Sequence, residues 1–248
     1  MAGHSKWSTI KRKKAAVDAK RGKVFTRLLK EVQIAAKIGG GNLEGNPRLK
    51  TAVATAKASS VPNDNIERAI KRGTGEDEGV DYEEVVYEGY GPGGVAILIK
   101  TLTDNKNRTV AEVRHALTKH NGSLASANAV AYQFKDRGVL TIAKEQISED
   151  DLYDAALEAG ADDISDEGEY WEIKTEPNDI EQVREALVAL EKEVDGEVRP
   201  VPDNSVMVSG KDAQSLLKLL DMLDDLDDVQ NVVANFDLDD AEMAALEG

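Results

Sequence analysis

The spacing of apolar residues changes once along this chain, near residue 80, and this change limits what the chain can fold into. Before it, apolar side chains such as Val24, Leu28 and Val32 recur every three or four residues, which is the period of an amphipathic helix. After it, β-rich runs such as 84–88 and 95–101 alternate with turn residues. The sequence therefore predicts a helical N-terminal part followed by mixed α and β structure.

Three short helices are predicted in the N-terminal part. The first covers 24–38 and ends at a glycine triplet, because glycine readily takes the left-handed conformation that follows a helix C-terminus. The second covers 47–59 and the third 62–73, each with a proline at its start. We expect a basic all-α domain with a flexible arm over residues 1–78.

The remaining elements predict two α+β units. We expect strands at 84–88, 95–101, 127–134, 138–143, 163–165, 169–175, 194–201 and 229–237, and helices at 109–120, 151–159, 179–191 and 212–226. Segment 137–201 then has the split βαβ, or ferredoxin-like, order. The fold class predicted is multidomain α+β: a three-helix bundle and two ferredoxin-like domains, one inserted in the other. The discontinuous domain takes 79–135 and 205–248, and the inserted domain takes 136–204.

Charge is divided unevenly along the chain. Residues 1–75 carry a net charge of +12 and residues 76–248 a net charge of −28, within a total of −16. Such segregation raises the self-energy of each surface unless a partner neutralises it. The basic part attracts nucleic acid and the acidic part repels it, so the division points to a nucleic-acid partner for the N-terminal domain.

The basic arm and first helix hold the strongest candidates. Residues 1–37 contain eleven Lys and Arg residues against two acidic residues, and Trp7 interrupts the charges. Cations displace counterions from phosphates, and an aromatic ring can stack on an exposed base. The alternative is a solvated tail with Trp7 packed on the bundle. The predicted nucleic-acid-binding residues here are Lys6, Trp7, Lys11, Arg12, Lys13, Lys14, Lys20, Arg21, Lys23 and Arg27.

A second candidate is the polar segment Asn105-Lys106-Asn107-Arg108, predicted at the start of a helix. Free N–H groups at a helix N-terminus favour anions. Short polar side chains there are also ordinary caps, but the helix dipole disfavours the two cations at that end. We therefore include Asn105, Lys106, Asn107 and Arg108 among the predicted phosphate or RNA contacts.

Residues suited to catalysis or metal binding are few. The chain has no cysteine, and two of its three histidines, His115 and His120, are five apart on a predicted helix, which places them on different faces. Gly89, Gly91 and Gly94 fit a dinucleotide-binding spacing, but the run that follows predicts a strand where that site needs a helix. We expect no catalytic residue, no metal, no cofactor and no small-molecule substrate.

An acidic helix face is harder to interpret. Asp221, Asp224, Asp225 and Asp228 share one face near the predicted C-terminus of the last helix, where carboxylates oppose the helix dipole and repel one another. A solvated face, a divalent-cation site and a site for a basic partner all remain open. The basic arm of the same chain is one such partner.

No run of 18 apolar residues is present, which predicts no membrane span. The start of the chain has basic residues without an apolar segment behind them, which argues against a secretory signal. A mitochondrial transit peptide is the alternative to a bacterial-type cytoplasmic protein, which we expect.

Several long motifs resemble the YebC family. They are Met1-Ala2-Gly3-His4-Ser5-Lys6-Trp7, the run 18–25, Gly39-Gly40-Gly41, Asn46-Pro47, the runs 62–66, 87–94 and 103–109, and the run 227–232 with Asn235-Phe236. The resemblance spans essentially the whole chain. It implies an all-α domain followed by two α+β domains, and no enzymatic activity.

Two functions follow from the resemblance. Family members are usually described as probable transcriptional regulators that bind DNA. A mitochondrial relative activates translation, and some bacterial relatives are associated with stalled ribosomes. We therefore expect a non-enzymatic regulator of gene expression that binds DNA. The alternative is a ribosome-associated translation factor that contacts ribosomal RNA or tRNA through the basic domain. A hydrolase that uses the acidic cluster is a weaker third hypothesis.

Overall fold

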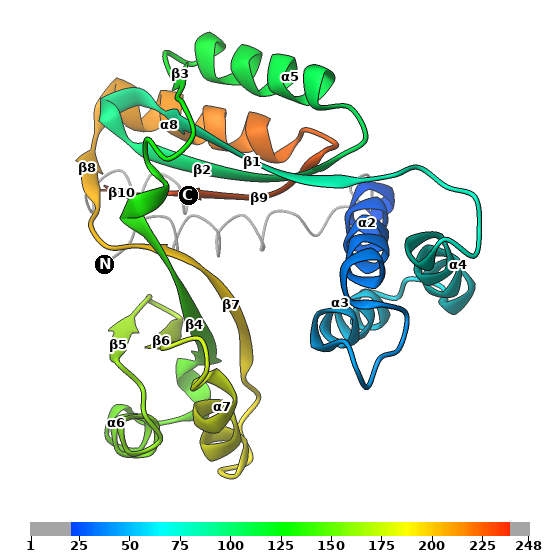
Figure 1. Cartoon of the computed structure of the whole chain (residues 1–248). Coiled ribbons are helices and arrows are strands. Elements are labelled where there is room, and N and C mark those ends of the chain that lie inside the picture. Colours follow the sequence, from blue (N-terminus) through cyan, green and yellow to red (C-terminus); the bar gives the residue numbers. More distant parts are fainter. Residues whose placement is uncertain (1–20, 239–248) are drawn as a thin grey trace.

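A computed structural model describes residues 21–238 of the chain. The fold is multidomain α+β, as predicted: a helical bundle, a sheet layered with two helices, and a second sheet layered with two more. Figure 1 shows these three parts, with the bundle at the right and the second sheet at the bottom. None of the helices in this part of the chain is long and apolar enough to cross a membrane.

The bundle consists of α2 (Arg21–Gly39), α3 (Pro47–Ala58) and α4 (Asn63–Thr74), close to the three predicted helices. Asn46 joins two of them. Its side-chain oxygen accepts a hydrogen bond from Leu49 N at 3.1 Å and so caps α3, while its amide nitrogen donates to Ala35 O of α2 at 2.8 Å. The cap therefore fixes where α3 leaves α2. The apolar core between the helices comprises Val32, Ala35, Ala36, Leu49, Ala52, Val53, Ala56, Val61, Ile66 and Ala69.

Gly73 lets α4 approach α2 closely. A Cβ atom on Gly73 would overlap the backbone oxygen of Gln33 and lie 2.7 Å from Ala36 Cβ. Real Cβ atoms do not come this close to neighbours, so only glycine allows this helix spacing.

The first sheet has the order β3-β1-β2-β9. Its strands are β1 (Glu83–Tyr90), β2 (Ala96–Thr103), β3 (Ser123–Leu124) and β9 (Val229–Ala234). Helices α5 (Lys106–Lys119) and α8 (Gly210–Asp224) cover one face, as Figure 1 shows, and apolar residues 130 and 134 pack on the other. Burial on both faces explains why β2 is almost continuously apolar.

In the sequence, the strands of the second sheet come after β3 and before β9 of the first sheet. It comprises β4 (Phe134–Ala143), β5 (Asp163–Asp166), β6 (Tyr170–Thr175) and β7 (Asp195–Pro202), with α6 (Glu149–Glu158) and α7 (Ile180–Val188). Its order β5-β6-β4-β7 is the predicted split βαβ order. The first sheet begins instead with the hairpin β1–β2 and has a different strand order. These sheets support the domain boundaries at 78, 135 and 204, which we keep as a proposal.

The strand predicted at 127–134 is wrong, and Glu88 provides the physical reason. Its buried carboxylate accepts hydrogen bonds from the backbone N–H groups of Asn128 at 2.6 Å, Val130 at 2.7 Å and Ala131 at 2.8 Å. Three convergent N–H groups require a turn rather than an extended chain. The segment forms a short 3₁₀ turn, and β4 starts only at Phe134.

The strand predicted at 229–237 is interrupted at Asn235. The Asn235 side-chain oxygen accepts a hydrogen bond from Ala96 N at 2.7 Å, so this side chain takes the place of a backbone partner. Beyond it, β10 (Phe236–Leu238) turns to pair in parallel with β8 (Val206–Val208), a strand that the sequence did not predict.

Replacing Gly73 by Ala is expected to lower the free energy of unfolding by about 1–3 kcal/mol, because the added methyl group forces α4 away from α2. Guanidinium chloride unfolding followed by circular dichroism measures this change. Gly22→Ala is the matched control, since a Cβ at Gly22 of α2 meets nothing within 4 Å. It should leave stability unchanged or raise it slightly. Equal effects of the two substitutions would contradict the packing argument.

Candidate nucleic-acid interface

The predicted nucleic-acid-binding residues divide into three groups. Arg21, Lys23 and Arg27 lie in the first half of α2, and residues 105–108 begin α5. The remaining predicted contacts lie outside the described residues: Lys6, Trp7, Lys11, Arg12, Lys13, Lys14 and Lys20.

The cations of α2 face the acidic end of α8. Lys23, Arg27 and Lys30 are spaced by four and three residues, so they share one face of the helix. Lys23 and Arg27 also donate hydrogen bonds to backbone oxygens of Asp225 and Asp224, which are carbonyls that a helix leaves free at its C-terminus. The ion pairs are Lys23 Nζ to Asp225 Oδ1 (3.8 Å) and Asp227 Oδ1 (3.9 Å), Arg27 Nη1 to Asp224 Oδ1 (3.3 Å), and Lys30 Nζ to Asp228 Oδ1 (2.9 Å).

These contacts give a basic partner to three of the four predicted acidic residues, Asp224, Asp225 and Asp228. Carboxylates near a helix C-terminus are unfavourable by themselves, and three cations from α2 compensate for them. The partner of this face in the structure is therefore a basic segment of the same chain.

Asp228 is the centre of this junction, with a side chain only 2% exposed. Its carboxylate accepts hydrogen bonds from Lys30 Nζ at 2.9 Å, Arg108 Nη2 at 2.6 Å, Thr109 Oγ1 at 2.7 Å and Thr103 Oγ1 at 3.1 Å. Burial by itself raises the pKa of Asp228, but these hydrogen bonds outweigh burial and lower its pKa to about 2. The group is thus a buried, charged link between α2, the start of α5 and the turn before β9.

The second candidate segment is also paired internally. Asn105 caps α5 by accepting a hydrogen bond from Arg108 N at 3.1 Å. Arg108 contacts Asp104 and Asp228, and Lys106 Nζ lies 2.6 Å from Glu83 Oε2. Carboxylates of the chain itself therefore account for the two cations that the helix dipole disfavours. A nucleic-acid contact at residues 105–108 stays a prediction.

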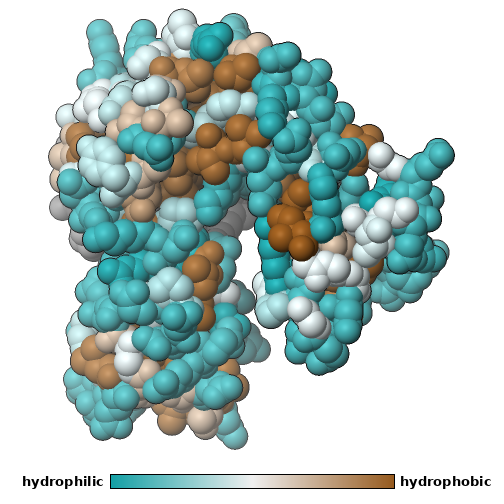
Figure 2. Space-filling model, in the orientation of Figure 1, coloured by the Kyte–Doolittle hydropathy of each residue, from teal (hydrophilic) through white to brown (hydrophobic). Residues whose placement is uncertain are grey.

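A further ion pair joins the bundle to the first sheet. Arg48 of α3 contacts Glu31 of α2 at 2.8 Å and Glu84 of β1 at 2.6 Å. Within residues 21–238, charged side chains therefore attach the bundle to the first sheet at Arg48 and at the Asp228 junction. Figure 2 shows a mostly hydrophilic surface on the face in view, with hydrophobic side chains in small groups among the hydrophilic ones.

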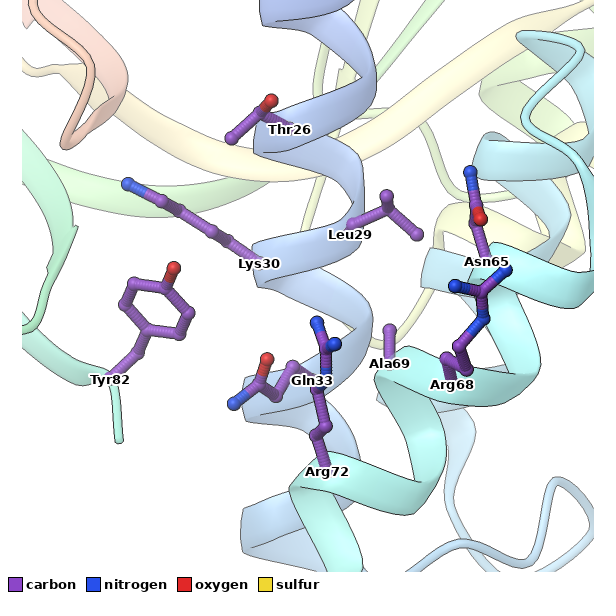
Figure 3. A pocket seen from close by; sticks show the side chains of 9 residues that line it. All are labelled: Thr26, Leu29, Lys30, Gln33, Asn65, Arg68, Ala69, Arg72 and Tyr82. Atoms are coloured by element: carbon purple, nitrogen blue, oxygen red, sulfur yellow. The ribbon is translucent and has the colours of Figure 1, made fainter. Parts of the chain in front are cut away.

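A cleft opens beside the Asp228 junction, between α2 and α4. Its volume is about 280 Å³. Figure 3 shows its lining, in which polar side chains of the two helices and Tyr82 surround a small apolar floor. The lining residues are Thr26, Leu29, Lys30, Gln33, Asn65, Arg68, Ala69, Arg72 and Tyr82.

The sequence did not point to Arg68 and Arg72 as candidate contacts. Arg68 and Arg72 lie four apart on a helix that was predicted, and Asn65 precedes Arg68 by three residues, so their common face could have been found from spacing. No local pattern placed Tyr82 opposite them, because that contact depends on how the chain returns from α4 to β1.

The comparisons with known proteins cover nearly the whole chain. The sequence profile described as the TACO1/YebC protein N-terminal domain matches residues 5–76, and the profile of the TACO1/YebC second and third domain matches residues 82–236. A probable transcriptional regulatory protein of Geobacter sulfurreducens is 54% identical over 247 residues, covering 99% of this chain and 100% of that protein. One from Acidithiobacillus ferrooxidans is 56% identical over 248 residues, covering 100% and 99%.

Among solved structures, a conserved hypothetical protein of Aquifex aeolicus has the same fold. Its TM-score is 0.82 at 44% sequence identity, over 91% of this chain and 94% of that one.

Asp228→Asn is expected to lower the free energy of unfolding near neutral pH by about 3 kcal/mol, because Lys30 and Arg108 lose the carboxylate that they share. The folded-state pKa of about 2 lies below the ordinary 3.8, so the charged group stabilises the fold fully above pH 4 to 5. That contribution is lost as the pH falls through 2. Denaturant unfolding at a series of pH values should show the difference between the two proteins shrinking over this range. Asp227→Asn, at an 89% exposed side chain, is the control and should change stability little. A pH-independent difference would contradict this role of Asp228.

Proposed function

This chain belongs to the TACO1/YebC family, and we propose that it is a non-enzymatic regulator of gene expression that binds nucleic acid through its basic N-terminal domain. The relatives named probable transcriptional regulatory proteins support DNA as the target. The main observation behind this proposal is the net charge of +12 on residues 1–75, in a chain whose total charge is −16. A cytoplasmic location accords with this role.

The absence of a catalytic role is part of the proposal. Strongly shifted pKa values often mark catalytic groups. Asp228 has such a shift, but Lys30, Arg108 and two threonine hydroxyls occupy its oxygens. A carboxylate that is held in this way is neither a free base nor an open ligand, and its role is to join elements.

The same junction favours a second candidate, a ribosome-associated translation factor. A DNA duplex laid along α2 would bring its phosphates close to the carboxylates of Asp224, Asp225 and Asp227, which lie beside the cations of that helix. Like charges that close repel, so a uniform polyanion is a poor fit to this face. A ribosome offers both protein and RNA surfaces, and RNA is recognised largely by shape and by unpaired bases. In that case the basic domain contacts ribosomal RNA or tRNA.

Sedimentation and DNA-binding measurements separate the two candidates. Lysate is sedimented through sucrose, and duplex-DNA affinity is measured at several salt concentrations. Tight, sequence-selective duplex binding without ribosome association supports the transcriptional regulator. Comigration with ribosomes together with weak, sequence-independent DNA binding supports the translation factor.

The quadruple variant in which Lys11, Arg12, Lys13 and Lys14 are all replaced by Ala tests the arm. Each lost phosphate contact should reduce the slope of log affinity against log salt concentration by about 0.7–0.9. An unchanged slope would assign phosphate binding to other residues.

Neutralising the acids beside α2 should strengthen nucleic-acid binding. Asp224, Asp225 and Asp227 are changed to Asn together, which removes the carboxylate partners of Lys23 and Arg27 and their repulsion of phosphates, while the backbone contacts of both cations stay. The matched control changes Glu149, Asp150 and Asp154 of α6 to Asn or Gln, with the same change in net charge. Fluorescence anisotropy should show at least a several-fold larger gain for the first variant. Equal gains would mean that only the total charge matters.

A further inference from the structure

One wall of the cleft is a face of α4 that carries cations without acidic partners. Asn65, Arg68 and Arg72 are spaced by three and four residues and line the cleft together (Figure 3). Within residues 21–238, neither arginine forms an ion pair, and Arg68 donates only to the backbone oxygen of Asp64 at 3.3 Å. Most other arginines of the described chain contact a carboxylate. These two have no such partner and can bind an external anion.

The opposite wall is α2, which presents Thr26, Lys30 and Gln33 at spacings of four and three residues. Gln33 donates its amide to Val80 O at 2.6 Å, which leaves its side-chain oxygen toward the cleft as an acceptor. With Asn65 across the cleft, the walls therefore offer both hydrogen-bond donors and acceptors. Donors and acceptors together can form hydrogen bonds with the polar edge of a flat ligand. Leu29 and Ala69 between the walls give the apolar contact that such a ligand needs.

Tyr82 closes the third side of the cleft. Its ring is half-buried and lies 5.1 Å from Lys30 Nζ, measured to the ring centroid. Burial raises the pKa of Tyr82, and the nearby carboxylates of Asp104 and Asp228 raise it further, so the phenol is neutral near pH 7. A neutral aromatic ring beside cations is the arrangement on which single-stranded nucleic acids stack their bases.

The size of the cleft restricts the ligand. About 280 Å³ lies just below the usual range for small-ligand sites, and a nucleic-acid duplex cannot enter it. The hollow of about 590 Å³ on the other side of Lys30 and Tyr82 is lined by the carboxylates of Asp104, Glu112, Asp227 and Asp228, which repel phosphates. In a duplex the bases are also stacked and paired, so their faces and Watson–Crick edges are not available to Tyr82, Gln33 and Asn65. A single base with its sugar and phosphate has the required combination of a flat ring, polar edges and negative charge.

We propose that the cleft between α2 and α4 binds one unstacked nucleotide of a single-stranded nucleic acid, with the base against Tyr82 and the flanking phosphates on Arg68 and Arg72. This inference rests on the proposed function, namely that the chain binds nucleic acid. It adds a defined site and a preference for unpaired strands, and it uses none of the residues predicted from the sequence.

The test measures binding of the full-length protein to a fluorescein-labelled oligouridylate and, separately, to a labelled DNA duplex of equal length. The variant Arg68→Gln with Arg72→Gln should lower the slope of log affinity against log salt concentration for the single strand by about 1.4, for two lost phosphate contacts. The control is Lys50→Gln with Lys57→Gln on the exposed side of α3, which has the same charge change in the same bundle. Duplex binding should respond equally to both double variants.

Tyr82 is tested by two substitutions. Tyr82→Leu should weaken oligouridylate binding about ten-fold, because the stacking surface is lost, and Tyr82→Phe should bind as the unmodified protein does. Photocrosslinking of an oligonucleotide that contains 5-iodouridine should label Tyr82 in the unmodified protein and not in the arginine double variant. Circular dichroism melting shows that each variant is folded.

The outcomes distinguish the two levels of the proposal. If the unmodified protein binds neither probe, the proposed function fails and the site fails with it. If it binds oligouridylate but the arginine variant matches the lysine control, or Tyr82→Leu binds normally, only the nucleotide site is overturned. Equal losses of single-strand and duplex binding in the arginine variant also overturn the site, since they make the arginines general phosphate contacts.

Discussion

The most buried charged contact between the bundle and the first sheet is the carboxylate of Asp228. It takes charged hydrogen bonds from Lys30 of α2 and Arg108 of α5 while almost fully withdrawn from water. Burying a charge without partners costs free energy, and a buried ion pair compensates for this cost only when its geometry is good. The position of α2 over the end of α8 is therefore fixed by few atoms. The cleft beside it takes its shape from the same contact, since Lys30 belongs to both.

Part of the positive charge of the N-terminal domain is neutralised by acidic residues of the same chain. Lys23, Arg27 and Lys30 neutralise acids that follow them by about two hundred residues. The cations of greatest local density are thus not all equally available to an outside partner. Arg68 and Arg72, which lie in a less basic stretch of sequence, are among the cations of residues 21–238 that form no ion pair. Charge counts along a sequence therefore locate a basic domain better than they locate its contact residues.

Local patterns predicted most of the fold but little of the candidate site. The helices of the bundle and the order of the second sheet follow from apolar spacing and turn residues, which act over a few neighbours. The turn at 128–131 could not be predicted, because the Glu88 carboxylate that shapes it lies forty residues away. The role of the aspartates of α8 was open for the same reason. Spacing predicted one shared helix face, but α8 ends at Asp224, and Asp228 is buried in the turn beyond it. Only the folded chain shows that α2 contacts Asp224, Asp225 and Asp228.

The second sheet is joined to the first by neighbouring strands. Phe134, at the start of β4, pairs with Pro202, at the end of β7, so the chain enters and leaves this sheet at one place. Such a connection behaves mechanically as a two-stranded ribbon: it resists extension but bends and twists with little cost. Bending beyond Phe134, which itself packs on the first sheet, would leave the core of that sheet intact. The length of this ribbon sets how far the second sheet and its helices extend from the first sheet. It can change during evolution without disturbing either core.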